Sequence, residues 1–148
     1  MVDNKFHFGR LLTNLNVMKR ELPILLANQA QNFFVRSFTQ QGWDGQHWQE
    51  VKRRQEGTPE YKYPKFKGLS RRTSPILVRT GRLRRAVSNS IRSATWQSIR
   101  LVVDLPYAAN QNEGVTIPRR HYMGNSPLLV AEQQLKIRTY INKIWSQH

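Results

Sequence analysis

The histidines and acidic residues are the side chains that could carry acid–base or metal chemistry, and their spacing argues against both. No two histidines lie three or four residues apart, as ligands on one helix face would; they are His7, His47, His121 and His148. Asp44 and Glu50 are six residues apart in a glycine-containing stretch, which is no evidence of general acid–base chemistry. That stretch, "DGQHWQE", also lacks the ordered oxygen ligands of a calcium loop. We therefore expect no enzymatic activity, no cofactor and no metal.

The densest positive charge lies around "ILVRTGRLRRAVSNSIRS", from Ile76 to Ser93. Residues 51–100 carry fourteen basic and two acidic side chains, in a chain of net charge +15. Such a field attracts nucleic acid, acidic protein surfaces or anionic membrane. The single glycine of the run cannot build the phosphate-binding nest of a P-loop. We expect subunit or DNA contacts from a set of arginines: Arg71, Arg72, Arg79, Arg82, Arg84, Arg85, Arg119 and Arg120.

Length and composition indicate one domain over residues 1–148. A chain of this size can bury a genuine hydrophobic core. It has no cysteine, which excludes disulfides and thiolate metal sites and is compatible with a reducing cytosol. No apolar run reaches the roughly 18–20 residues of a membrane span, and the N-terminus lacks the features of a secretory signal. We expect a soluble protein that does not act on a membrane.

Two segments at the ends of the chain show helical periodicity. Apolar residues recur at steps of three and four over residues 9–40, but Pro23 interrupts them. This predicts a helix near 9–20 and another near 22–40, with one kinked helix as the alternative. Ser126 and Pro127 are favourable residues for starting a C-terminal helix. Its expected core stripe consists of Val130, Gln134, Ile137, Ile141, Ile144 and Trp145.

Between these helices we expect a long loop, a turn and a β-hairpin. Residues 41–75 contain many glycines, prolines, aromatic and basic residues, which suits either single-stranded nucleic acid or a segment that orders on assembly. We favour the second interpretation and expect this loop to be mobile in the isolated chain. A turn or helix start is expected at Thr80–Gly81, followed by two antiparallel strands. The first strand includes Val87, Ile91 and Ala94, and the second covers 99–103.

A short helical turn from Tyr107 to Asn112, closed by Gly114, and an extended segment that ends at Gly124 complete the expected elements. The fold class is therefore α+β. N-terminal helices and a C-terminal helix pack on a small antiparallel β-sheet, with a long irregular basic loop.

Four stretches in this order resemble the phage virion morphogenesis (tail completion) family. They are Phe34 and Phe38 followed by Gly45–Trp48; Leu77–Ala86, similar to an L-x-x-[ST]-G-x-L motif; Tyr107-Ala108 ahead of Gly114; and Ile117–Gly124, similar to P-x-R-x-[FY]-x-G. The positions that carry the resemblance are Trp48, Leu77, Gly81, Leu83, Tyr107, Gly114, Pro118, Arg119 and Tyr122. The resemblance covers about Leu11 to Trp145.

The resemblance implies a structural virion protein that completes the tail or joins it to the head, usually as a ring of identical copies. Its implied partners are copies of itself and other phage tail or head–tail connector proteins. Virion DNA could pass through the ring without sequence reading. The resemblance implies no catalysis and no small-molecule substrate, and it places the protein in the virion after assembly in the host cytoplasm. The alternative from charge alone is a basic nucleic-acid-binding protein without sequence specificity.

Overall fold

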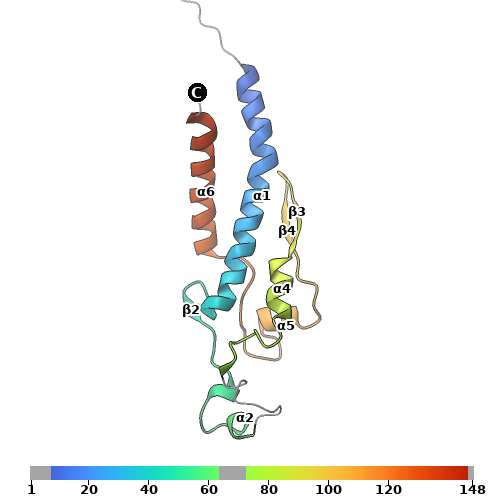
Figure 1. The fold of residues 1–148 in the computed structure, drawn as a ribbon, viewed down its shortest axis with the longest axis vertical. Helices are drawn as coiled ribbons and strands as arrows, with labels where there is room; N and C mark the ends of the chain where they lie inside the picture. The colour runs from blue at the N-terminus through green and yellow to red at the C-terminus, as the bar shows by residue number, and fades with distance from the viewer. Residues whose placement is uncertain (1–7, 64–72, 147–148) are drawn as a thin grey trace, which may run out of the picture.

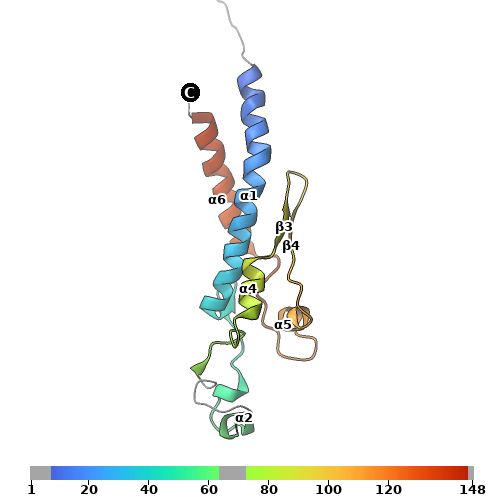
Figure 2. The same ribbon diagram turned by 45° about the vertical axis from the view of Figure 1, so that its right-hand side comes forward.

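A long helix and an antiparallel partner form the frame of the molecule. The computed structural model describes residues 8–63 and 73–146. Helix α1 (Phe8–Gln40) extends along most of the molecule, and α6 (Pro127–Ser146) lies beside it and runs in the opposite direction (Figures 1 and 2). A β-hairpin and a shorter helix pack on another side of α1.

Helix α1 continues through Pro23, so the predicted division into two helices is wrong and the alternative of one helix is correct. A proline inside a helix removes one backbone hydrogen bond and costs about 3 kcal/mol in an isolated helix. Here Leu22 and Pro23 are buried, as are Ala27 and Ala30 in the following turns. Burial of apolar surface on this part of the helix offsets the local cost of the proline.

The turn or helix start predicted at Thr80–Gly81 is the start of a short helix. Gly81 has φ +68° immediately before α4 (Arg82–Ser88), a backbone conformation that glycine adopts without strain. Leu83 and Val87, four residues apart, are the buried residues of α4. Val87 therefore belongs to this helix and not to the following strand, because its spacing from Leu83 places both side chains on the face of α4 that meets the core.

The predicted hairpin is confirmed by strands β3 (Ile91–Ala94) and β4 (Ile99–Leu101). They pair antiparallel, with Ile91 opposite Leu101 and Ala94 opposite Ile99. The backbone N–H of Thr95 donates to the carbonyl of Ser98 at 2.9 Å and closes the turn. The hairpin packs along α1 (Figures 1 and 2).

Helix α5 (Ala108–Glu113) lies close to its predicted limits, and α6 begins where it was predicted, at Ser126–Pro127. Gly114 ends α5 with φ +73°, and the Ser126 hydroxyl accepts a 3.1 Å hydrogen bond from the N–H of Leu129 in the first turn of α6. The predicted core stripe of α6 is wrong in part. Val130 and Ile141 are 49% and 38% exposed, whereas Leu129 and Tyr140 are the buried residues.

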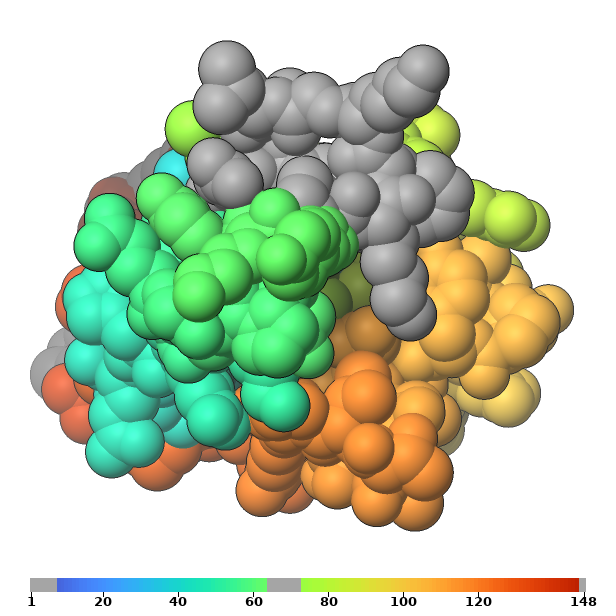
Figure 3. Space-filling model, turned by 90° about the horizontal axis from the view of Figure 1, so that it is seen from below, coloured from blue at the N-terminus to red at the C-terminus, as the bar shows by residue number. Residues whose placement is uncertain are grey.

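The part of the 41–75 loop that the structure describes contains short regular elements. Strands β1 (Gly42–Trp43) and β2 (Gln46–His47) pair antiparallel, and the 3-10 helix η1 (Lys52–Arg54) and helix α2 (Pro59–Lys62) follow. Figure 3 shows this end of the molecule, with η1 and α2 in green, the preceding turn in cyan and the chain after α5 in orange. Mobility of the loop in isolation remains a prediction.

The fold class is α+β, as predicted, with two separate two-stranded antiparallel sheets in the described residues. The core lies where the C-terminal half of α1 meets α4, the loop after α1 and the chain around Tyr122. Its buried side chains are Ala30, Phe34, Phe38, Trp48, Val51, Ile76, Leu83, Val87, Ala108, Tyr122 and Leu129.

Candidate functional site

The motif stretches that are far apart in the sequence meet around the end of α1. The Phe38 ring packs edge-on against Trp48, with centroids 5.8 Å apart, and lies 5.4 Å from the Tyr122 ring. The indole N–H of Trp48 donates a 2.7 Å hydrogen bond to the carbonyl of His121. Two motif stretches, Phe34–Trp48 and Ile117–Gly124, are therefore joined by both packing and a hydrogen bond. We call this group, with Ala108 and Leu83, the motif cluster.

Asn112 connects the third motif stretch to the fourth. Its Oδ1 accepts from the backbone N–H groups of Tyr122 (2.9 Å) and Met123 (3.1 Å), and its Nδ2 donates to the Met123 carbonyl at 3.0 Å. The Tyr122 hydroxyl donates to the carbonyl of Ala108 at 3.0 Å. Burial raises the pKa of Tyr122 to about 12, because the ring is almost fully enclosed and the charged form is disfavoured. Sequence reasoning missed Asn112, because its side chain bonds backbone groups about ten residues further along the chain.

Gly114 is required where the chain turns back toward Arg119. It has φ +73°, and a Cβ placed on it would lie 2.6 Å from the Cβ of Arg119 and 2.7 Å from its backbone nitrogen. Any side chain at this position would therefore separate α5 from the Pro118–Arg119 segment.

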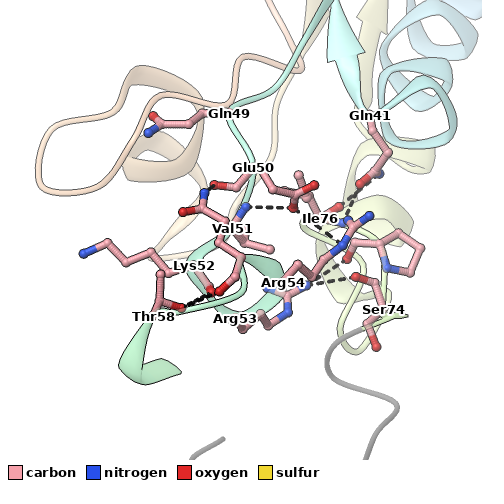
Figure 4. Close-up of polar contacts among 12 residues, drawn as sticks. Gln41, Gln49, Glu50, Val51, Lys52, Arg53, Arg54, Thr58, Ser74 and Ile76 are labelled. Atoms are coloured by element: carbon pink, nitrogen blue, oxygen red, sulfur yellow. Dashed lines mark hydrogen bonds and ion pairs between the residues drawn. The ribbon is translucent and has the colours of Figure 1, made fainter. Parts of the chain in front are cut away.

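Gln41 attaches the second motif stretch to the end of α1 (Figure 4). Its Oε1 accepts from the N–H of Ile76 and its Nε2 donates to the carbonyls of Phe38 and, at 3.2 Å, Ile76. Arg53 of η1 donates to the carbonyls of Ser74 at 3.0 Å and Pro75 at 3.4 Å. Next to this anchor, Leu77 has φ +61° and packs at the edge of the core. No feature of the sequence indicates this role of Gln41.

The predicted contact arginines fall into different environments. Arg82, Arg84 and Arg85 are exposed on α4, and none of them forms an ion pair with a carboxylate of the described residues. Arg79 is exposed and lines a hollow of about 330 Å³ with Tyr107 and Gln111. Arg119 is exposed and donates to the Asn112 carbonyl at 3.4 Å. Arg71 and Arg72 lie outside the described residues.

Arg120 differs from the other predicted contact arginines because it is buried. It is 8% exposed, and its Nη2 donates to the Gln49 carbonyl at 3.5 Å. Burial lowers the pKa of its guanidinium, and the negative charge of Glu50 opposes that shift only in part. The Arg120 side chain therefore helps to hold the loop after β2 in place and is not part of the exposed arginine surface.

His121 lies beside a polar hollow of about 380 Å³ whose lining includes His47, Gln49 and Arg119. Arg119 Nη2 lies 3.0 Å from His121 Nδ1, and the imidazole packs edge-on against Trp43 at 4.5 Å. Burial, followed by the charge of Arg119, lowers the pKa of His121. In the described part of the chain no group of three or more His, Cys, Asp or Glu residues could hold a metal ion.

Comparisons of this chain with protein-family models, with curated proteins and with solved structures find no match. Within the residues that the structure describes, no helix has both the length and the apolar character needed to cross a bilayer.

Proposed function

We propose that this chain is a structural virion protein of a tailed phage or prophage, acting in tail completion or head–tail joining. It acts through protein–protein contacts, as a ring of identical copies that binds other tail or connector proteins. It assembles in the host cytoplasm and remains in the virion. It has no small-molecule substrate and no membrane partner.

The observation that carries this proposal is the convergence of the four motif stretches. Phe38, Trp48, Leu83, Ala108 and Tyr122 come from all four stretches and are all part of one buried cluster. Short motifs that recur together in a family are expected to pack into one core, because each motif supplies buried side chains against which the others pack. The convergence therefore supports the family resemblance on which the function depends.

The exposed arginines of α4 supply the contact surface. Arg82, Arg84 and Arg85 lack carboxylate partners among the described residues, so their charge is available to an acidic surface of a neighbouring subunit or to DNA phosphates in a central channel. Neither contact requires base reading.

The test is to mix the purified protein with tails that lack it. Negative-stain images and light scattering of the protein alone and with tails should show rings and density at one tail end. A monomer that never associates with tails would contradict the proposal.

The same arginines favour one second candidate, a nucleic-acid-binding protein without sequence specificity. Duplex DNA binding by the isolated chain, measured across a salt series, separates the two. Tight binding by a monomer with a steep salt dependence favours the second candidate, because each neutralised phosphate releases counterions.

A further inference from the structure

A groove lined by apolar side chains runs between α1, α6 and the tip of the β3–β4 hairpin. We call it the apolar groove. It encloses about 450 Å³, and its lining includes Met18, Leu22 and Leu26 of α1, Trp96 of the hairpin turn, and Ile137 and Ile141 of α6. Trp96 is 48% exposed although it is the largest side chain of the lining. The groove lies apart from the motif cluster, whose α1 residues, such as Phe34 and Phe38, belong to the other end of the helix.

The apolar surface continues beyond the groove along the N-terminal turns of α1. These turns project past the ends of both α6 and the hairpin (Figures 1 and 2). Phe8 and Leu12 are 66% and 59% exposed there. Exposed apolar surface of this extent is uncommon on a protein that works alone and marks an interaction site.

Both helices carry apolar residues at the alternating three- and four-residue spacing of a coiled-coil seam. In α1 the seam is Phe8, Leu11, Leu15, Met18, Leu22 and Leu25. In α6 it is Val130, Ile137, Ile141 and Ile144, with the polar Gln134 at the position between Val130 and Ile137. The α1–α6 pair does not bury these seams fully, because α6 turns Leu129 and Tyr140 inward instead and leaves Val130 and Ile141 partly exposed. A further helix lying over both would bury both seams in the manner of a helical bundle.

The charge around the groove indicates which helix would fit. The part of α1 from Phe8 to Leu26 carries Arg10, Lys19 and Arg20 but one acid, Glu21. Glu21 pairs with Arg20 at 3.6 Å and accepts a 2.9 Å hydrogen bond from the Tyr140 hydroxyl.

The same imbalance is found on the other helix. From Glu132 onward α6 carries Lys136, Arg138 and Lys143. Its acid, Glu132, is held by Arg36 of α1 at 2.8 and 2.9 Å. Both acids are thus engaged within the chain, and the excess charge on these parts of the two helices is positive.

We propose that the apolar groove binds an amphipathic helix of another protein, whose apolar seam is flanked by aspartate and glutamate. A second copy of this chain would bring the same positive charges against the first and is disfavoured by like-charge repulsion. An apolar helix with acidic flanks would fill the groove and pair with the lysines and arginines beside it. The inference rests on the proposed function only in assuming that the protein works by docking to other proteins.

The test uses two synthetic helical peptides of about three heptads with the same leucine seam. One carries glutamate at the flanking positions and the other carries lysine. Binding of each to the full chain is measured by fluorescence anisotropy. The glutamate peptide should bind at least tenfold more tightly, and its affinity should fall between about 50 and about 500 mM salt because the pairs are screened. Equal binding of both peptides, or of neither, would overturn the proposal.

A matched pair of variants locates the binding. Ile141→Glu places a repelling charge in the groove and should lower the affinity for the glutamate peptide at least tenfold. Leu135→Glu, on the same helix but outside the groove lining and 66% exposed, should leave the affinity within twofold. Trp96→Glu, at the exposed hairpin turn, gives a second groove variant if Ile141→Glu fails to fold. Equal loss in the groove and control variants would contradict the assignment.

Sedimentation of the full chain without peptide tests whether a second copy of the chain occupies the groove instead. A dimer that Ile141→Glu dissociates and Leu135→Glu does not would show that a second copy fills the groove, and it would overturn the proposal. Because the peptide measurement needs neither tails nor rings, its result is independent of the outcome for tail completion.

Discussion

The indole N–H of Trp48 lies 2.7 Å from the carbonyl oxygen of His121, which is 73 residues further along the chain. This hydrogen bond links the loop after α1 to the segment before α6. It also fixes the Trp48 ring at an orientation in which it packs against Phe38. The hydrogen bond and the ring packing together hold the first and fourth motif stretches against each other.

Replacing Trp48 with phenylalanine should therefore destabilise the protein by about 1–3 kcal/mol. The variant keeps an aromatic ring against Phe38 but leaves the His121 carbonyl without its donor in a partly buried place. Urea unfolding followed by circular dichroism measures the loss. Trp96→Phe, at an exposed turn, serves as the control and should change stability by less than about 0.5 kcal/mol. Equal losses in the two variants would show that the hydrogen bond contributes nothing.

Alanine at Gly114 should be more damaging than alanine at Gly57. Both glycines have positive φ, +73° and +88°, so each substitution carries a backbone cost of about 1–2 kcal/mol. A Cβ at Gly57 meets nothing within 4 Å, whereas one at Gly114 meets Arg119 at 2.6 Å. The difference between the two melting temperatures isolates the contact between α5 and the Arg119 segment. We expect the Gly114 variant to melt clearly lower.

Acidification should weaken the fold through His121. Its pKa is lowered in the folded protein, first by burial and then by Arg119, so the unfolded chain takes up a proton more readily. The resulting stability is fully present above the ordinary histidine pKa of 6.5 and is lost as the pH falls through the lower folded value.

His121→Gln should accordingly show a flatter dependence of unfolding free energy on pH between neutral and acid conditions. His47→Gln, at an exposed position, is the matched control and should follow the wild-type curve. Identical pH curves for wild type and His121→Gln would rule out this role for the imidazole.

Neutralising the α4 arginines should affect contacts and not folding. Arg82→Gln, Arg84→Gln and Arg85→Gln together remove three exposed charges without ion-pair partners among the described residues, at a cost of less than about 0.5 kcal/mol each. If these side chains touch DNA, the slope of log affinity against log salt should fall by about 0.9 for each lost phosphate contact. If they touch a neighbouring subunit, ring formation should decline instead. A triple variant with unchanged assembly and DNA binding would exclude both.

Helix periodicity, capping residues and the hairpin pattern were sufficient to predict most elements from the sequence. Ser126 and Gly114 set the predicted limits of α6 and α5 because they act through local backbone bonds, which a sequence displays directly. The break at Pro23 was wrong because a local propensity was outweighed by burial over the rest of α1, which is a tertiary effect. The β-branched side chain of Val87 favours a strand, whereas its packing beside Leu83 on the core face of α4 decides its conformation.

The motif positions were predictable as a set, but the bonds that join them were not. Asn112 and Gln41 act through backbone groups of distant segments, and neither their residue type nor their spacing reveals those partners. Arg120 was expected on the surface with Arg119, yet neighbouring residues in an extended segment face opposite ways and one of them turned inward. The exposure of the α6 seam was also not predicted. An apolar stripe indicates that a helix face is buried, but it does not indicate whether the same chain or another chain packs against it.

Helix α1 has 33 residues and is therefore about 50 Å long. One end of it holds the motif cluster and the other carries the uncovered apolar turns. A spectroscopic label at each end would therefore report the orientation of the chain in any assembly that it forms. In the proposed tail assembly, the distance from either label to a fixed point on the tail would show which end of helix α1 faces the head.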